Sequence, residues 1–195
     1  MQNNRYNIIT QILKEELNLS DAICNKFMEL SDIQILKKKD MFAEKGKVCK
    51  HLGIIESGVL RSYIEKDDSE FIKDFYFPGS IVVSYGSFLT RDPSIGYIQA
   101  LEDTNLITLS RSAYDQLMKE SNEWLKFGKY ISDNLLIRKC RRETSFLMED
   151  AYERYKLLLK TYPGVEQYVS QYHIAAYLGI KPESLSRLKS LNIGQ

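Results

Sequence analysis

The pattern of apolar and polar positions divides the chain into a helical beginning, a strand-rich middle and a helical end. Near the N-terminus, apolar side chains such as Ile8, Ile12 and Leu13 recur about every 3.6 positions, which predicts a helix. Ser20 then suits the N-cap of a second short helix that contains Phe27. The chain is therefore expected to begin with two short helices.

From Ile33 to about Leu109, short runs rich in β-branched and aromatic residues replace this pattern. Turn residues separate the runs, and Gly46, Gly58 and Gly79 stand at three of these breaks. Several short strands at such spacing are typical of an antiparallel sandwich or barrel. We therefore expect an antiparallel β jelly roll in this part of the chain.

Near residue 110 the strand pattern ends and helical patterns return. Ser112 and Asp115 fit a capping box that opens a short helix. A helix without proline is then expected from about 121 to 148, and a further one over about 151–161.

The long helix carries an apolar surface that is too wide for a single neighbour. Its main stripe consists of Trp124, Phe127, Ile131 and Leu135. A barrel could cover one side of the helix and a second copy of the chain the other, as in a parallel two-helix seam. We expect homodimer contacts at these four residues; burial within a single monomer is the alternative.

The segment from Val169 to Leu191 has the pattern of a helix-turn-helix. Ser170 can cap its first helix, Gly179 suits a tight turn, and Pro182 suits the first position of the second helix. The residues expected to contact DNA are Ser170, Lys181, Glu183, Ser184, Ser186, Arg187 and Lys189. Such side chains suit a major groove, because arginine pairs with guanine and glutamate accepts from cytosine. A helical hairpin with no nucleic-acid role is the alternative.

The distribution of charge agrees with an anionic partner for the C-terminal part. The whole chain has a net charge of +1, but residues 138–195 hold 10 basic and 6 acidic side chains, against 17 and 20 in residues 1–137. A solvated helical face would give the same small excess, so charge alone decides nothing.

Several classes of protein are not expected from this sequence. The apolar runs are only a few residues long, so no segment should cross a membrane, and the first residues lack the pattern of a signal peptide. The cysteines Cys24, Cys49 and Cys140 are widely spaced, which indicates reduced thiols and a cytoplasmic protein.

Taken together, these segments resemble the Crp/Fnr family of bacterial transcription regulators. The resemblance is carried by the three turn glycines, by Phe77-Pro78-Gly79, and by the run from Tyr177 to Arg187. It implies an α+β fold in three parts: a cyclic-nucleotide-binding-like sensor jelly roll (1–120), a long dimerisation helix (121–148) and a helix-turn-helix domain (149–195).

The resemblance also assigns roles within the second helix of the helix-turn-helix. It implies that Glu183 and Arg187 read bases and that Ser184 contacts a phosphate or a base. Pro182 stands where many family members carry an arginine, so a different operator is expected. The sequence leaves no room for the strand pair, or wing, that often follows, and we expect weaker phosphate-dependent affinity as a result.

Cyclic nucleotides are not expected as ligands. The glutamate and arginine that hold the cyclic nucleotide in the family are missing, with Pro93–Gly96 in place of the arginine segment, and Arg91 is expected to point to solvent. An anionic phosphate would need such a cation or a nest of donors. The barrel could instead hold another small effector, in a pocket lined by Tyr63, Ser84, Tyr85, Ser87 and Tyr97. A barrel filled by its own side chains is the equal alternative.

The sequence predicts no catalysis, no metal site and no cofactor. An iron–sulfur cluster needs four thiolates, and a cupin site needs several histidines inside the barrel, where His51 stands alone. The expected function is sequence-specific DNA binding by a transcription regulator, with double-stranded DNA as partner. A regulatory interaction module that no longer binds DNA is the alternative. RNA polymerase would be a partner of an activator, but no segment identifies a surface for it.

Overall fold

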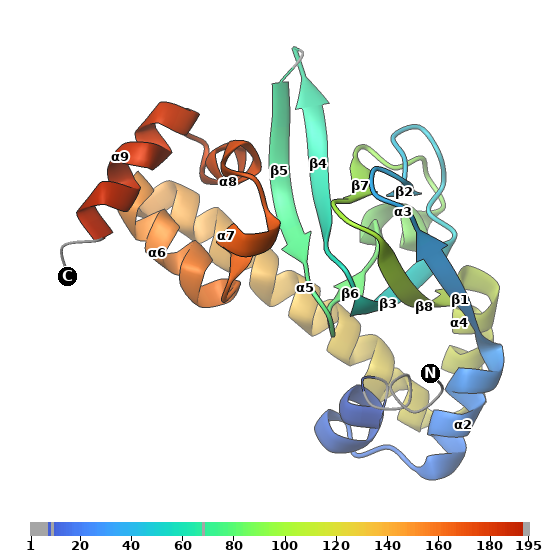
Figure 1. The fold of residues 1–195 in the computed structure, drawn as a ribbon. Helices are drawn as coiled ribbons and strands as arrows, with labels where there is room; N and C mark the ends of the chain where they lie inside the picture. The colour runs from blue at the N-terminus through green and yellow to red at the C-terminus, as the bar shows by residue number, and fades with distance from the viewer. Residues whose placement is uncertain (1–7, 9, 68, 193–195) are drawn as a thin grey trace.

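The protein consists of a β-sandwich followed by a long helix and a C-terminal group of helices (Figure 1). The structure, a computed structural model, describes residues 8, 10–67 and 69–192. The strands are β1 (Ser31–Leu36), β2 (Met41–Ala43), β3 (His51–Ser57), β4 (Leu60–Lys66), β5 (Ser69–Tyr76), β6 (Ile81–Val82), β7 (Tyr97–Ala100) and β8 (Thr104–Ser110). The helices are the π-helix η1 (Gln11–Glu16), α2 (Asp21–Leu30), α3 (Tyr85–Thr90), α4 (Arg111–Glu120), α5 (Asn122–Met148), α6 (Ala151–Thr161), α7 (Val165–Tyr168), α8 (Gln171–Leu178) and α9 (Pro182–Asn192). None of the helices in the described ranges is long and apolar enough to cross a membrane.

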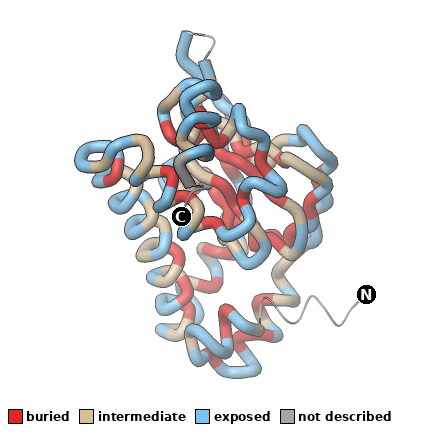
Figure 2. Tube along the Cα trace, turned by 60° about the vertical axis from the view of Figure 1, so that its left-hand side comes forward, coloured by how far each residue is buried: buried red, intermediate tan, exposed pale blue. Residues whose placement is uncertain are grey.

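The strands form two antiparallel four-stranded sheets. Their orders are β1-β8-β3-β6 and β2-β7-β4-β5. This arrangement of eight strands in two facing sheets is a jelly roll, so the predicted fold class is confirmed. Between the sheets lies the first hydrophobic core, where the β3–β8 register sets Leu52 opposite Leu109 and Ile54 opposite Ile107. The buried segments run through the middle of the sandwich (Figure 2).

The N-terminal helices extend this first core below the sandwich. The expected second helix is confirmed as α2, with Ser20 at the N-cap position, although its hydroxyl makes no capping hydrogen bond. The expected first helix is short and π-helical, with Ile12 and Leu13 buried. The ring of Phe27 meets that of Phe127 edge to face at 5.6 Å, which joins α2 to the long helix.

One predicted helix start is wrong by two positions. Helix α4 begins at Arg111, and its N-cap is Ser110, whose hydroxyl accepts a hydrogen bond from the backbone N–H of Ala113 at 3.2 Å. Ser112 is already inside the helix. The last residue of β8 therefore serves as the cap, so that strand and helix join without a loop.

The long helix α5 has the expected bounds, but its main apolar stripe does not face a second copy. Trp124, Phe127 and Ile131 are at most 1 % exposed, and Leu135 packs against the same core. The N-terminal helices, α4 and the sandwich cover this stripe within one protomer. Trp124, Phe127 and Ile131 are thus corrected from dimer contacts to core residues of the protomer, whereas Leu135 is half-buried and the dimer contact there stays a prediction. The apolar side chains of α5 that stay exposed are Leu125, Leu136, Ile137, Phe146, Leu147 and Met148.

The C-terminal head, which we define as residues 149–192 (α6 to α9), packs on the outer face of β5 (Figure 1). A second hydrophobic core forms at this contact, in which the rings of Phe75 and Tyr177 stack at 5.3 Å. Tyr162, at the end of α6, meets Phe75 edge to face. The head is therefore joined to the sandwich by packed side chains as well as by the chain itself.

Gly58 offers a test of how the sandwich is closed. It has a φ of +95°, and a Cβ there would lie 2.7 Å from the Asp103 carbonyl oxygen and closer still to the Thr104 hydroxyl. Strain and overlap should together make Gly58→Ala less stable by about 3 kcal/mol. Gly46→Ala, with positive φ but open space around it, should cost about 1 kcal/mol.

Urea unfolding of each variant measures these free energies. Gly86→Ala is the matched control, because Gly86 lies in α3 without positive φ, and a methyl group added there would have no neighbour within 4 Å. Equal stability of the Gly58→Ala and Gly46→Ala proteins would contradict the close approach at Gly58.

Candidate nucleic-acid interface

The helix-turn-helix is formed by α8 and α9, with the local signals that the sequence predicts. The Ser170 hydroxyl accepts from the backbone N–H of His173 at 3.3 Å and caps α8. Gly179, with a φ of +69°, ends α8 in the left-handed region that glycine favours. The backbone N–H of Ile180 then donates to Ala175, and Pro182 opens α9.

Helix α9 buries one side and leaves the other open. Leu185 is fully buried and Leu188 is half-buried, and both belong to the second core. The predicted DNA-binding residues that are exposed are Ser170 at the start of α8, Lys181 in the turn, and Glu183, Ser184, Ser186 and Arg187 on α9. Helix α9 lies on the far side of α8 from the sandwich, so β5 does not cover the exposed side chains of α9 (Figure 1).

Two of the predicted residues, Ser170 and Lys189, have partners within the head. Ser170 is the cap of α8. The Lys189 ammonium lies 2.5 Å from a carboxylate oxygen of Glu166, so it ties α9 to α7. The structure therefore brings six of the seven predicted residues to an open surface, and two of the seven, Ser170 and the half-buried Lys189, make contacts that hold the head together.

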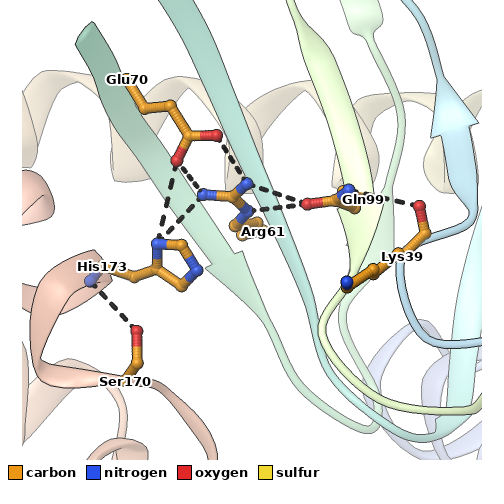
Figure 3. Close-up of polar contacts among 6 residues, drawn as sticks. All are labelled: Lys39, Arg61, Glu70, Gln99, Ser170 and His173. Carbon is orange, nitrogen blue, oxygen red and sulfur yellow. Dashed lines mark hydrogen bonds and ion pairs between the residues drawn. The ribbon is translucent and has the colours of Figure 1, made fainter.

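A buried arginine joins the head to the sandwich, and it was not identified from the sequence. Arg61 on β4 is only 5 % exposed and points outward toward α8 (Figure 3). Its guanidinium makes a two-point ion pair with Glu70 on β5 and donates to the Gln99 side-chain oxygen at 2.8 and 3.1 Å. Its Nη1 also lies 3.0 Å from Nδ1 of His173 on α8. An arginine between Leu60 and the apolar pair Tyr63 and Ile64 was the available signal, but its partners are distant in sequence.

The charges around His173 favour its neutral form. Burial lowers the pKa of His173 and the positive charge of Arg61 lowers it further, while Glu70 opposes both. The hydrogen bond from Arg61 lowers the pKa of Glu70. A neutral His173 can accept from Arg61 through Nδ1, whereas a protonated ring has two donors and no acceptor.

Two further polar contacts fix the head. Arg142 on α5 donates to the backbone oxygens of Ile72 on β5 and Tyr177 on α8, at 2.7 and 2.8 Å. Arg138 on α5 donates to Asp74 on β5 at 2.7 Å, and the hydroxyl of Tyr162 bonds to the same carboxylate. Each contact joins α5, the second sheet and the head, so a shift of one element disturbs the other two.

The five residues expected to line an effector pocket lie in different surroundings. Tyr63 and Tyr97 stack at 4.9 Å and belong to the second core, on the outside of the sheet. Tyr85 packs against the first core. The Ser84 hydroxyl bonds to Ser94 at 2.9 Å, and the Ser87 hydroxyl accepts from the backbone N–H of Cys49 at 2.9 Å. Tyr63 and Tyr97 thus face the head, while Ser84 and Ser87 have partners near α3.

The segment that corresponds to a phosphate cassette carries its arginine on the surface. Arg91 follows α3, and its side chain is 71 % exposed and 3.3 Å from Asp115. Its expected orientation toward solvent is confirmed. The Ser87 hydroxyl donates to the Asp92 carbonyl at 2.5 Å, so this hydroxyl also has its hydrogen bonds made.

Comparison with known proteins agrees with this architecture. Residues 33–121 match the family model described as "Cyclic nucleotide-binding domain". No curated protein sequence is similar at a significant level.

Several solved structures have the same fold over most of the chain. The regulator CLP of Xanthomonas campestris is similar with a TM-score of 0.70 and 18 % identity, over 90 % of this chain and 93 % of that one. FixK2 of Bradyrhizobium japonicum is similar with a TM-score of 0.72 and 18 % sequence identity, over 83 % of each chain. A third structure, from Eubacterium rectale, is described as a "putative transcriptional regulator of the crp/fnr family". Its TM-score is 0.69 and its sequence identity 20 %, over 91 % of this chain and 85 % of that one. Residues 33–121 thus match a cyclic nucleotide-binding domain model, and over about nine-tenths of its length the chain has the same fold as these regulators.

Proposed function

We propose that the protein is a sequence-specific DNA-binding transcription regulator of the Crp/Fnr type that acts as a homodimer. The observation that carries this proposal is α9, which buries Leu185 and leaves Glu183, Ser184 and Arg187 exposed after a well-formed turn. The structures with the same fold include a global regulator described as linking cell-cell signaling to virulence gene expression. The cysteines of this chain form no disulfide, which agrees with work in the cytoplasm, where bacterial DNA lies.

The exposed side of α9 has the chemistry needed to read a major groove. Arg187 can donate twice to guanine, and Glu183, one turn earlier, can accept from cytosine. Ser184 and Ser186 can reach phosphates or base edges, and Lys181 adds a positive charge in the turn. A second copy of the head would place two such helices about 34 Å apart on a pseudo-palindromic site.

The exposed apolar side of α5 supports the homodimer. Leu136, Ile137 and Leu147 are each more than half exposed, and the exposed Cys140 lies between them on the helix. Cys140 lies four positions after Leu136 and three after Ile137, and Leu147 follows it by seven, which are the spacings of a parallel two-helix seam. The dimer contact is therefore proposed on this side of α5 instead of on the buried Trp124 stripe.

The docking of the head gives the barrel a means to influence DNA binding. Arg61, Arg142 and Asp74 hold α8 and the end of α6 against the second sheet. A signal that moves β4 or β5 would change where α9 lies relative to α5. The regulator could respond to a small effector in this way or act without one; a cyclic nucleotide is not proposed.

An interaction module without DNA binding is the second candidate function. Selection of bound duplexes from a random DNA library, using the purified protein, separates the two. Recovery of a palindromic motif supports the proposal. Failure to enrich any motif, both with and without a small-molecule extract of the source cells, would favour the interaction module.

Arg187→Ala tests the reading of bases. On the preferred duplex the variant should lose about 1–3 kcal/mol of binding free energy and discriminate less at one base pair. Fluorescence anisotropy on the preferred and on random duplexes measures both effects. Arg141→Ala, which removes an exposed arginine of α5 outside the head, is the control. Equal losses on both duplexes would mean that Arg187 contacts only phosphate.

Leu136→Glu tests the dimer. A charge in the seam should be costly to bury, so the variant should sediment as a monomer at concentrations where the wild type is a dimer. Leu89→Glu is the matched control, because Leu89 is a similarly exposed leucine on α3, away from α5. A dimeric Leu136→Glu protein would show that the contact between copies lies elsewhere.

Lowering the pH should loosen the docked head. The pKa of His173 in the docked head lies below its usual 6.5, so an undocked head binds more protons as the pH falls through this region. Docking is therefore strongest at neutral pH and weakens below about pH 6.5. Amide hydrogen exchange in α8, compared between about pH 7.5 and 5.5 and corrected for intrinsic rates, measures the change.

His173→Asn keeps an acceptor for Arg61 and removes the titrating ring. This variant should stay docked at both pH values, while His51→Asn in the sandwich should behave as the wild type. The same pH response in wild type and His173→Asn would rule out His173 as its source.

A further inference from the structure

A cavity of about 550 Å³ opens where the head meets the sandwich and the long helix. Its walls come from β5 (Phe71, Lys73), α5 (Lys139, Phe146) and the end of α8 (Ala176, Gly179). It contains none of the five tyrosines and serines expected to line an effector pocket. Its size lies in the range of about 300–1,000 Å³ that is usual for small-molecule sites.

Two exposed aromatic rings form much of the apolar wall. Phe71 is 48 % exposed and Phe146 is 44 % exposed, although both adjoin well-packed regions. Gly179 lets α8 approach Phe146 closely, because a Cβ at this position would lie only 3.0 Å from the ring. The lining of the cavity therefore includes two apolar rings that remain in contact with water.

The rim of the cavity has unbalanced positive charge. Within the described residues, no carboxylate forms an ion pair with Lys73 or Lys139, and the nearby Asp74 bonds to Arg138 and Tyr162. Burial and the charges of Lys139 and Arg142 lower the pKa of Lys73. Glu143 supplies the one carboxylate that the described part of the chain contributes to the lining, against these three cations. The chemistry that complements this rim is an anion.

We propose that this cavity binds a small organic monoanion, with an aromatic body between Phe71 and Phe146 and a carboxylate held by Lys73 and Lys139. Such a molecule touches β5 on one side and α8 on the other, so it binds the docked head better than a displaced one. It then shifts the equilibrium toward docking by its difference in affinity for the two states. The regulatory consequence rests on the proposed function; the binding site does not.

Three probes of equal shape and different charge test the site: 4-phenylbutyrate, 4-phenylbutan-1-ol and 4-phenylbutylamine. Each is titrated into the protein of residues 1–195 while backbone amide shifts are followed by NMR. We expect saturable shifts at Ala176 and Gly179, with the acid bound at least about tenfold more tightly than the alcohol, and the amine not bound. Equal binding of all three probes, shifts elsewhere, or no saturation at millimolar concentrations would overturn the proposal.

Charge-removing variants locate the carboxylate. The double variant Lys73→Gln, Lys139→Gln should bind the acid only as well as the alcohol, and its affinity for the alcohol should not change. The control Lys119→Gln, Lys126→Gln removes two exposed lysines outside the cavity and should bind as the wild type. Unchanged affinity of the first double variant for the acid would refute the assigned carboxylate site.

Two further measurements separate the proposals from one another. If the shifts at the cavity depend on protein concentration and no probe binds, the cavity is an interface between copies, and the ligand site is wrong. DNA affinity is then measured with and without 4-phenylbutyrate. An affinity that the acid changes supports the regulatory role; DNA binding that the acid leaves unchanged refutes that role alone. A protein that binds the acid and no DNA refutes the proposed function and leaves the site standing.

Discussion

The buried guanidinium of Arg61 is the contact on which the relation between sandwich and head depends. A charge that is 5 % exposed must be paired, and Glu70 and Gln99 supply the pairing from β5 and β7. The remaining donor is directed at His173 on the head. The ion pair lies within the sheet and would survive movement of the head, so what docking adds is the contact with His173, and a hydrogen bond from a charged group contributes about 1.5–3 kcal/mol. The sheet is therefore more stable when α8 is docked against it.

The surrounding contacts follow from that arrangement. Tyr63 and Tyr97 stack beside Arg61, whose guanidinium lies 4.2 Å from the Tyr63 ring centre. On the same face, Phe75 lies opposite Arg61 in the strand register and stacks on Tyr177, while the adjacent Asp74 of β5 bonds to Arg138. Polar contacts thus fix the position of the head on the sheet, while the stacked rings bury apolar surface between them. This division explains why the second core is richer in tyrosine than the interior of the sandwich.

The parts that the sequence could predict are those determined over a few residues. Gly179 and Pro182 specify a turn and a helix start through their own backbone preferences, and the long helix has its expected bounds. The Trp124 stripe was predicted correctly as apolar, but which surface covers it depends on helices far away in the sequence. Whether Tyr63 lies inside or outside the sandwich depends on strand register, which shifts between Ser62 and Tyr63 in the β4–β5 pair. The partners of Arg61 lie 9, 38 and 112 positions away, a distance that no local pattern encodes.

The place of α9 limits how a sensor domain could govern it. In the docked head, α8 lies between α9 and β5, and Glu183 and Arg187 are open to solvent (Figure 1). Docking therefore leaves the proposed DNA-reading side uncovered, so it cannot act by shielding that side. What it does determine is the direction in which α9 projects from α5, because Arg142 and Arg138 tie α5 to the head and to β5 together. In a dimer joined along α5, that direction sets the separation of the two α9 helices, and DNA accepts only separations that match its helical turn. Geometry between heads, rather than exposure of either one, is thus the quantity that this fold is able to regulate.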